Sequence, residues 1–381
     1  MRYYSSMVNV AFTGGGTGGH VYPGLAVARS LKERFSGQGC RVFWIGSDRG
    51  MERAIVLEAG LEFFGVPAGK LRRYFSLRTL PDAFRVAAGF FAARRILKKQ
   101  KAVLLFSKGG FVSVPPCAAA ASLGIPVFTH ESDFSPGLAT RINLRFVRKT
   151  AGKVFVSYAG TASSLSGRLP EGRVAVSGNP VRRDFRSADA SKGRAFLGLG
   201  LQERILLVLG GSQGAAQVNA LVSESLESLC LHYTVVHQCG RQPEQDLQRR
   251  PGYIPLAYIG QEMPHILAAA ELVLGRSGAG TVWESAVLGK PMILIPLSGS
   301  GTRGDQVENA RFFEKEGAAL VFAGKDATAG NICGAAACLA GDSQKRENMA
   351  AASKRIGCID GAEIIADSIA GMLKPEKENG V

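Results

Sequence analysis

The sequence begins the same structural pattern twice, and this repetition constrains the fold more than any other feature. A short apolar run, Met7–Phe12, enters a glycine-rich loop and then a segment with helical spacing of apolar residues, Tyr22–Phe35. In the second half, the apolar run Ile205–Leu209 again enters a glycine-rich loop before another predicted helix. Apolar strands that alternate with helices are typical of parallel sheets with helices on both faces. We therefore predict an α/β protein of two doubly wound, Rossmann-like domains in tandem, with a cleft between them.

Further strands of the same type are predicted in both halves. Their ranges are Arg41–Ile45, Val103–Phe106, Pro126–Thr129, Lys153–Val156, Tyr233–Gln238, Ala257–Ile259, Leu272–Leu274 and Met292–Ile295. Glycine and proline punctuate the chain at Gly178-Asn179-Pro180, which predicts a domain join there. We expect an N-terminal domain over residues 1–181, a C-terminal domain over 182–373 and a tail over 374–381, with the last helix able to pack back on the first domain.

Composition disfavours several classes of protein. The seven cysteines are odd in number and form no Cys-x-x-Cys pair, which argues against a disulfide framework or a zinc site and favours a reducing compartment. Because no Asp-x-Asp pair and no cluster at ligand spacing occurs, we expect no bound metal, and we expect no cofactor. The N-terminus lacks the apolar core of a signal peptide, and no uncharged apolar run of about 18 residues occurs. We expect a cytosolic protein with peripheral membrane contact only.

Basic residues are concentrated in the first half of the chain. Residues 1–181 carry 25 Lys and Arg against 9 Asp and Glu, whereas the remainder carries 21 against 22. Residues 71–101 hold nine cations and one acid, interleaved with bulky apolar side chains. Part of this segment must be a core-facing helix, Ala83–Leu97, but apolar groups ringed by cations also suit an anionic membrane surface. Nucleic acid is the alternative partner, disfavoured because no helix-turn-helix, zinc or RNA-binding motif is present. The predicted membrane contacts are Tyr74, Phe75, Arg72, Arg73 and Arg78.

The first glycine loop, Gly14–Gly19, has the spacing of a dinucleotide fingerprint. NAD is disfavoured because the next strand ends in Gly46-Ser47 rather than in an acid that could hold a ribose, and because the chain has a second such loop. Loops of this kind at helix N-termini bind anions through backbone N–H groups, so two of them could hold a nucleotide diphosphate. His20 lies where the helix begins, and the helix dipole favours its neutral form, which suits a general base. A purely structural histidine is the alternative.

A second candidate site follows the predicted strand Leu272–Leu274. The segment Gly275–Glu284 supplies small residues at a turn and then enters a helix. Glu284, about one turn into that helix, can reach ribose hydroxyls with two acceptor oxygens, although a capping role or a solvated helix face would explain it equally well. Gly304-Asp305-Gln306 and Asn309 follow the next strand and are a weaker signal of ligand binding.

Five segments together resemble the MurG family, the lipid-linked N-acetylglucosaminyltransferases of peptidoglycan synthesis. They occur in the family's order: Gly15–Ala28 (GGTGGHVYPGLAVA), Gly109–Pro115, Gly178–Arg182, Gly210–Ala215 and Arg276–Glu284. The resemblance implies a two-domain glycosyltransferase-B fold. It implies inverting transfer of N-acetylglucosamine from UDP-GlcNAc to the C4 hydroxyl of MurNAc in undecaprenyl-diphosphoryl-MurNAc-pentapeptide, at the cytoplasmic face of the plasma membrane.

The resemblance also implies site residues. Glu284 would hold the ribose, and Arg182 and Ser212 would serve the diphosphate or the sugar. The implied donor contacts are Thr17, Gly18, Gly19, Arg182, Ser212, Ile259, Ala279, Gly280, Thr281, Val282, Trp283, Glu284 and Gln306. Other cell-wall synthesis proteins are compatible partners.

The chain departs from the family's usual sequence at three places. Where the family has His-Glu-Gln-Asn, this chain has His130-Glu131-Ser132-Asp133, and an ionised Asp133 cannot donate as the amide does. Asp133 remains a substrate-binding candidate, and either Glu131 or Asp133 could share the catalytic role with His20. Ser107-Lys108 replaces small or apolar residues, and Asp305 replaces Gln or His. The alternative functions are another UDP-sugar glycosyltransferase, a UDP-GlcNAc 2-epimerase of the same fold, and a non-catalytic UDP-sugar-binding protein.

Overall fold

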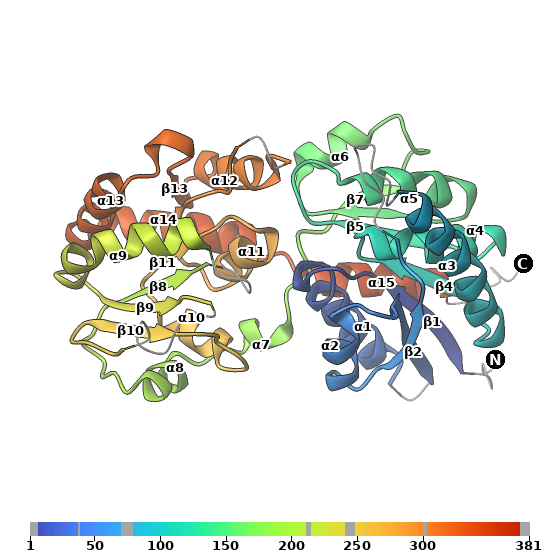
Figure 1. The fold of residues 1–381 in the computed structure, drawn as a ribbon, viewed down its shortest axis with the longest axis horizontal. Helices are drawn as coiled ribbons and strands as arrows, with labels where there is room; N and C mark the ends of the chain where they lie inside the picture. Colours follow the sequence, from blue (N-terminus) through green and yellow to red (C-terminus); the bar gives the residue numbers. More distant parts are fainter. Residues whose placement is uncertain are drawn as a thin grey trace, which may run out of the picture. The chain divides into compact units, whose positions relative to one another are not determined.

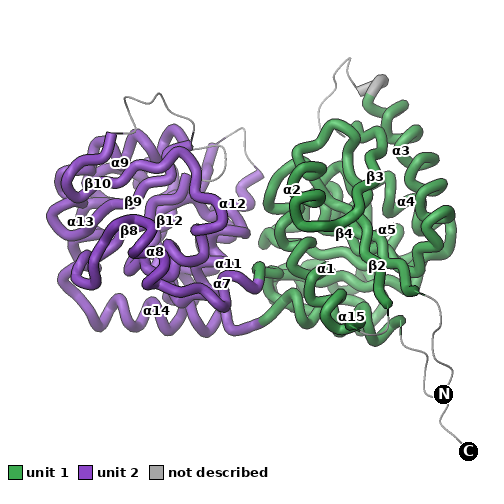
Figure 2. Tube along the Cα trace, turned by 90° about the horizontal axis from the view of Figure 1, so that it is seen from below, with its two compact units in different colours: residues 1–182, 360–381 green, residues 183–359 purple. Residues whose placement is uncertain are grey.

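The chain folds into two compact α/β units. The computed structural model describes residues 7–36, 39–69, 79–210, 215–240, 248–299 and 303–373. Residues 1–182 and 360–381 belong to one unit and residues 183–359 to the other (Figure 1, Figure 2). Each unit is built on a parallel sheet, which confirms the predicted fold class.

The first unit contains a seven-stranded parallel sheet in the order β3-β2-β1-β4-β5-β6-β7. The strands are β1 (Val8–Thr13), β2 (Cys40–Ser47), β3 (Glu62–Val66), β4 (Leu104–Ser107), β5 (Val127–Glu131), β6 (Val154–Val156) and β7 (Val174–Val176). The direction of strand addition reverses between β1 and β4. In sheets of this kind, ligands bind at that point, beyond the carboxyl ends of the strands.

Helices cover both faces of this sheet because alternate strand residues are apolar on opposite sides. Val10 and Phe12 pack with one set of helices, and Ala11 between them packs with the other. The first set is α1 (Tyr22–Arg34), α2 (Glu52–Glu58) and α15 (Gly361–Leu373); the second is α3 (Thr79–Lys99), α4 (Val114–Ser122), α5 (Leu138–Lys149) and α6 (Ala159–Leu165). The terminal helix α15 thus completes the core of the first unit, with Ile365 and Ile369 fully buried.

A close approach between α1 and β2 fixes the start of α1. A Cβ atom added to Gly24 would lie 2.6 Å from Trp44 Cη2, so only glycine lets the helix sit this close to the indole. Trp44 Nε1 donates a hydrogen bond to the Gly14 carbonyl at 3.1 Å. The buried indole therefore anchors both ends of the segment that carries the first glycine loop.

The second unit contains a six-stranded parallel sheet in the order β10-β9-β8-β11-β12-β13. The strands are β8 (Ile205–Leu209), β9 (Thr234–Gln238), β10 (Tyr253–Leu256), β11 (Leu272–Gly275), β12 (Met292–Leu294) and β13 (Ala319–Val321). The helices are α7 (Arg183–Arg186), α8 (Ala190–Leu197), α9 (Ala216–Cys230), α10 (Met263–Ala269), α11 (Ala279–Val287), α12 (Asp305–Lys315), α13 (Ala329–Gly341) and α14 (Ser343–Gly357). The strand order reverses between β8 and β11.

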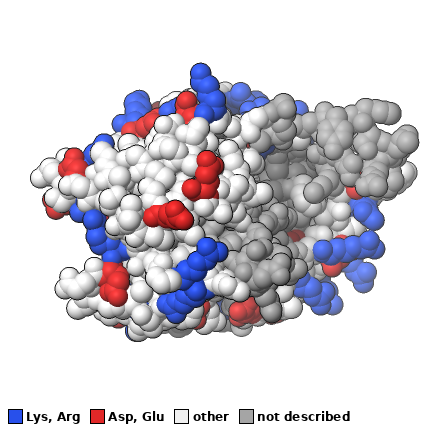
Figure 3. Space-filling model, turned by 60° about the vertical axis from the view of Figure 1, so that its left-hand side comes forward, with Lys and Arg blue, Asp and Glu red and all other residues white. Residues whose placement is uncertain are grey.

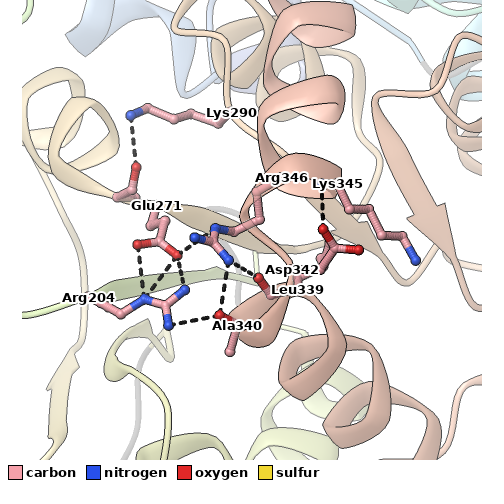
Figure 4. Close-up of polar contacts among 9 residues, drawn as sticks. Arg204, Glu271, Lys290, Leu339, Ala340, Asp342, Lys345 and Arg346 are labelled. Atoms are coloured by element: carbon pink, nitrogen blue, oxygen red, sulfur yellow. Dashed lines mark hydrogen bonds and ion pairs between the residues drawn. The ribbon is translucent and has the colours of Figure 1, made fainter.

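A charged cluster stabilises the amino-terminal edge of this second sheet (Figure 4). Arg204 immediately precedes β8, and its Nε lies 3.1 Å from both carboxylate oxygens of Glu271, which precedes β11. Arg346 Nε on α14 lies 3.0 Å from the same carboxylate. Both guanidinium groups also donate to the carbonyl of Ala340 near the end of α13, where the helix dipole favours cations. This cluster lies at the edge opposite the carboxyl ends of the strands.

One predicted strand is wrong and three strands were not predicted. The edge strand β10 ends at Leu256, so Ala257–Ile259 lies beyond it. β10 contains Pro255, and an edge strand tolerates proline because one side of its backbone needs no partner. The unpredicted strands β3, β7 and β13 are likewise edge strands, either short or interrupted by glycine.

Candidate active site

His20 lies at the point where the first sheet reverses its strand order. It ends the short 3-10 turn Gly18–His20 between the first glycine loop and α1, and it is partly exposed. A Cβ atom added to Gly109 would lie 3.9 Å from His20 Nδ1, and one added to Gly110 would lie 3.1 Å from His20 Cδ2. Both glycines, which follow β4, also have positive φ values of 86° and 76°. The imidazole therefore lies against a glycine pair whose conformation favours glycine at both positions, and at Gly110 an added Cβ would also lie 2.4 Å from the Gly15 carbonyl oxygen.

Glu52 holds the loop that carries His20, a role that could not be predicted from the sequence. Its side chain is fully buried. The carboxylate accepts hydrogen bonds from the Ser47 N–H at 2.8 Å and from the Gly16 N–H at 3.3 Å. A Cβ atom on Gly15 would lie 2.5 Å from Glu52 Cδ, so the loop packs directly on the carboxylate. An acid in the first turn of a helix is common, and nothing in the sequence distinguishes one that points into the fold.

The remaining predicted residues of this loop are accessible to a ligand. Thr17 and Gly19 are exposed and Gly18 is partly exposed. The Thr17 carbonyl accepts the His20 N–H at 3.1 Å. A cavity of about 490 Å³ opens beside the loop, lined by Gly16, Asp48, Arg49, Glu52, Arg85 and Phe111 among others. Loop and cavity together offer a surface on which a polar substrate can bind.

Arg182 lies beside the same helix start. Its guanidinium carbon is 5.0 Å from the ring centroid of Tyr22, the first residue of α1. By its contacts Arg182 belongs to the first unit. This places a permanent cation in a cation–π contact with Tyr22, which follows His20 by two residues.

Buried polar residues follow β4 and β5 along the same sheet edge. Glu131 is 5% exposed, and its carboxylate accepts the N–H groups of Asp133 at 3.1 Å and Gly137 at 2.9 Å. These bonds favour a role in shaping the loop before α5, rather than a role as base. Asp133 itself is partly exposed, so it remains a substrate-binding candidate.

His130 and Lys108 are also buried there, each 1% exposed. Burial, followed by the charge of Lys108, holds the pKa of His130 well below its usual value. Because His130 Nε2 lies 3.0 Å from the Gly178 carbonyl, which can only accept, Nε2 carries the proton of the neutral ring. Burial lowers the pKa of Lys108 to about 8, against the opposing charges of Glu131 and Asp133.

The Lys108 pKa makes stability depend on alkaline pH. Its folded-state pKa of about 8 lies below the ordinary value of 10.5, so the unfolded chain binds the proton more tightly and stability rises with pH across that interval. We expect the free energy of unfolding of the wild type, measured by urea denaturation relative to Lys108→Met, to increase by about 2–3 kcal/mol between about pH 7 and pH 10. A difference that does not change with pH would contradict the buried position of the ammonium group.

In the second unit, the predicted donor residues lie at the start of α11, directly after β11. Ala279, Gly280, Thr281 and Glu284 are partly exposed. A Cβ atom on Gly280 would meet no described atom within 4 Å. The first turn of α11 is therefore open at Gly280, and the backbone N–H groups of such a helix start are candidates for binding an anion.

Other residues that were predicted to contact UDP-GlcNAc make contacts within the protein itself. Val282 and Trp283 are 0% and 2% exposed, and the Val282 N–H donates to Gly278 within the helix, so their side chains build the core. Ile259 is buried, and its N–H donates to the Gln238 side chain at 3.1 Å. Gln306 Oε1 accepts the Leu297 N–H at 3.0 Å. A substrate role for these four positions stays a prediction.

Several predicted residues lie outside the part of the chain that the structure describes. These are Ser212, Arg72, Arg73, Tyr74, Phe75 and Arg78. Within the described part, no group of three or more His, Cys, Asp or Glu side chains could hold a metal ion.

Comparisons with known proteins agree with this arrangement. The glycosyltransferase family 28 N-terminal domain matches residues 10–152, and the glycosyltransferase family 28 C-terminal domain matches residues 205–364. The UDP-N-acetylglucosamine–N-acetylmuramyl-(pentapeptide) pyrophosphoryl-undecaprenol N-acetylglucosamine transferase of Treponema denticola is 50% identical over 337 residues, covering 83% of this chain and 84% of the relative. The protein of the same name from Treponema pallidum is 46% identical over 375 residues, covering 96% of each chain.

A solved structure extends the comparison to three dimensions. The crystal structure of Acinetobacter baumannii MurG matches with a TM-score of 0.71 and 25% identity, covering 96% of this chain and 100% of that one. The matches span both units and include the loops that carry His20 and Glu284. The chain therefore belongs to glycosyltransferase family 28 and, within it, to the MurG family of N-acetylglucosaminyltransferases.

Proposed function

We propose that this enzyme transfers N-acetylglucosamine from UDP-GlcNAc to the C4 hydroxyl of MurNAc in undecaprenyl-diphosphoryl-MurNAc-pentapeptide, with inversion. The observation that carries the proposal is the identity of 46–50% to relatives named for this transfer. The position of His20 at the reversal of the first sheet supports it, because an acceptor hydroxyl needs a base there.

In the proposed reaction, His20 takes the proton of the C4 hydroxyl while that oxygen bonds to C1 of the donor sugar. The bond between C1 and the phosphate oxygen breaks from the opposite face, and UDP leaves. Arg182 and the N–H groups at the start of α11 offset the charge on the departing diphosphate. No step in this scheme requires a metal ion. The scheme requires one general base, so the buried carboxylate of Glu131 is not needed as a second one.

Glu284 is proposed to hold the donor's ribose. Replacing it by Ala leaves the ribose hydroxyls without their acceptor, at a cost of roughly 1–3 kcal/mol. We expect a higher KM for UDP-GlcNAc, by about 5- to 150-fold, with weaker inhibition by UDP. Glu262→Ala, a carboxylate removed elsewhere in the same unit, is the control. Unchanged KM and unchanged UDP inhibition in Glu284→Ala would contradict the assignment.

The alternative enzymes predict different products. A 2-epimerase would convert UDP-GlcNAc alone into its C2 epimer, and another transferase would ignore the lipid-linked acceptor. Incubation of the enzyme with UDP-GlcNAc alone should leave the sugar nucleotide unchanged by NMR. Appearance of the epimer would favour the 2-epimerase.

The membrane proposal rests on α3. Phe84 and Phe91 are 73% and 68% exposed and lie seven residues apart, on one side of the helix, while Ala93 and Leu97 are buried. Exposed cations flank them, including Arg85, Arg95, Lys98 and Lys99. None of the helices in the described residues is long and apolar enough to span a membrane. We propose that this face rests on anionic lipid at the cytoplasmic side of the plasma membrane. Tyr74, Phe75, Arg72, Arg73 and Arg78, which lie outside the described residues, are proposed to add to lipid binding.

Vesicle binding tests this surface. Phe84→Ser/Phe91→Ser should bind phosphatidylglycerol vesicles more weakly than the wild type, and wild-type binding should weaken as salt rises. Leu201→Ser/Leu231→Ser, which removes two exposed leucines of the second unit, is the matched control and should bind normally. Equal binding by all three proteins, or none by the wild type at low salt, would rule out the surface.

Nucleic acid is not a proposed partner. On the face drawn in Figure 3, acidic and basic side chains lie scattered among uncharged ones. Residues 182–381 as a whole carry almost balanced charge, with 21 basic and 22 acidic residues. A nucleic-acid phosphate backbone binds best to a stripe of cations, which the balanced charge of residues 182–381 does not favour.

A further inference from the structure

Lys108 begins a buried chain of polar side chains that connects three loops. Its Nζ donates to Ser132 Oγ at 2.6 Å, and Ser132 Oγ donates to Asn179 Oδ1 at 2.7 Å. All three residues are at most 6% exposed. They follow β4, β5 and β7 respectively, so the chain crosses the carboxyl-end edge of the first sheet.

Both ends of this chain reach the proposed reaction centre. Lys108 directly precedes the glycine pair that packs on His20. Asn179 lies three residues before Arg182, which stacks on Tyr22 at the start of the same helix. The polar chain therefore joins the loop behind the proposed base to the segment that carries the proposed diphosphate cation.

Negative charge reaches Lys108 from β5 and the loop that follows it. Cβ atoms added to Gly14 and Gly24 would lie 3.1 and 3.7 Å from Lys108 Cβ, so the first glycine loop and α1 pack closely on the stem of this side chain. On β5 and the loop after it, Glu131 and Asp133 supply negative charge, and His130 is neutral. A buried cation that lacks compensation is costly, so the loop after β5 and Lys108 depend on each other.

We infer that Lys108 is a positioning residue for the transfer reaction. Its ammonium group offsets the carboxylates of Glu131 and Asp133, and its hydrogen bond to Ser132 fixes the Arg182 segment relative to the glycine pair behind His20. The role rests on the proposed function.

A double-mutant cycle tests the inference. Lys108→Met, Asp133→Asn and the double variant are assayed for transfer from UDP-GlcNAc to the lipid-linked acceptor. Lys149→Met, the same change at an exposed position on α5, is the control. We expect Lys108→Met to lower kcat/KM for the acceptor at least 10-fold in the wild-type background. In the Asp133→Asn background, the fold loss caused by Lys108→Met should be at least 10 times smaller. The KM for UDP-GlcNAc should change much less.

A merely structural lysine would give a different pattern. Equal losses in the two backgrounds, or no loss, would overturn the inference. Lys108→Gln, which keeps a hydrogen-bond donor but no charge, is the second variant. If Lys108→Gln is fully active and thermal unfolding shows that Lys108→Met is misfolded, the inference is also overturned. Activity of the wild type is measured first. Absence of wild-type transfer would refute the proposed function, whereas wild-type activity with no coupling would refute only the role of Lys108.

Discussion

Replacing His20 by Ala is expected to lower kcat by about 10²–10⁴-fold, the range that general base catalysis contributes. The acceptor hydroxyl must lose its proton as it attacks, and the imidazole is held for this purpose against Gly109 and Gly110. Because the donor is proposed to bind mainly at α11, UDP-GlcNAc affinity should change much less.

The control for this variant is His232→Ala, which removes an exposed histidine of the second unit and should leave kcat unchanged. Glu131→Gln keeps the size of the side chain but only one of its two N–H acceptors, so if Glu131 only shapes its loop, any loss of activity should accompany a loss of stability. Near-wild-type kcat in His20→Ala at saturating substrates would contradict the assignment. A large kcat loss in Glu131→Gln without loss in His20→Ala would transfer the role of base to Glu131.

Replacing Glu52 by Ala is expected to cost about 3 kcal/mol of stability and to lower kcat as well. The change leaves the buried N–H of Ser47 and the partly buried N–H of Gly16 without an acceptor, and loss of the acceptor of a buried donor costs about 1–3 kcal/mol. The substitution also leaves a cavity where the loop that carries His20 packs on the Glu52 side chain. Urea denaturation measures the first effect and the transfer assay measures the second.

Glu58→Ala is the matched control because Glu58 ends the same helix, α2, but is exposed. It should change stability by less than about 0.5 kcal/mol. Comparable stability losses in the two variants would show that the buried carboxylate does not account for the effect of Glu52→Ala.

The sequence predicted the central strands and not the edges of the sheets. Central parallel strands such as Ile205–Leu209 are buried on both faces, so they appear as continuous apolar runs. The edge strand Tyr253–Leu256 contains Pro255, and the edge strand Glu62–Val66 contains Gly65 and an exposed acid. Edge strands have fewer neighbours, so their composition is less constrained and carries a weaker signal.

The same division holds for the site. His20 is noticeable in the sequence because it adjoins a glycine loop between a strand and a helix, and its catalytic role stays a prediction. The role of Glu52 could not be predicted, because its partners are backbone N–H groups five and 36 positions away, and backbone groups leave no trace in sequence. In the sequence, Lys108 is notable only as a departure from the small or apolar residue usual in the family. Its proposed positioning role depends on the hydrogen-bonded chain through Ser132 to Asn179, which tertiary folding brings together.

The most direct test of the proposed function is transfer of radiolabelled N-acetylglucosamine to lipid. The purified enzyme is incubated with labelled UDP-GlcNAc and undecaprenyl-diphosphoryl-MurNAc-pentapeptide, and the lipid is extracted with organic solvent. The account predicts label in a lipid product that forms only when this acceptor is present and that His20→Ala forms far more slowly. Label that remains in UDP-GlcNAc, with an acceptor shown to be competent by a MurG-family relative, would contradict it.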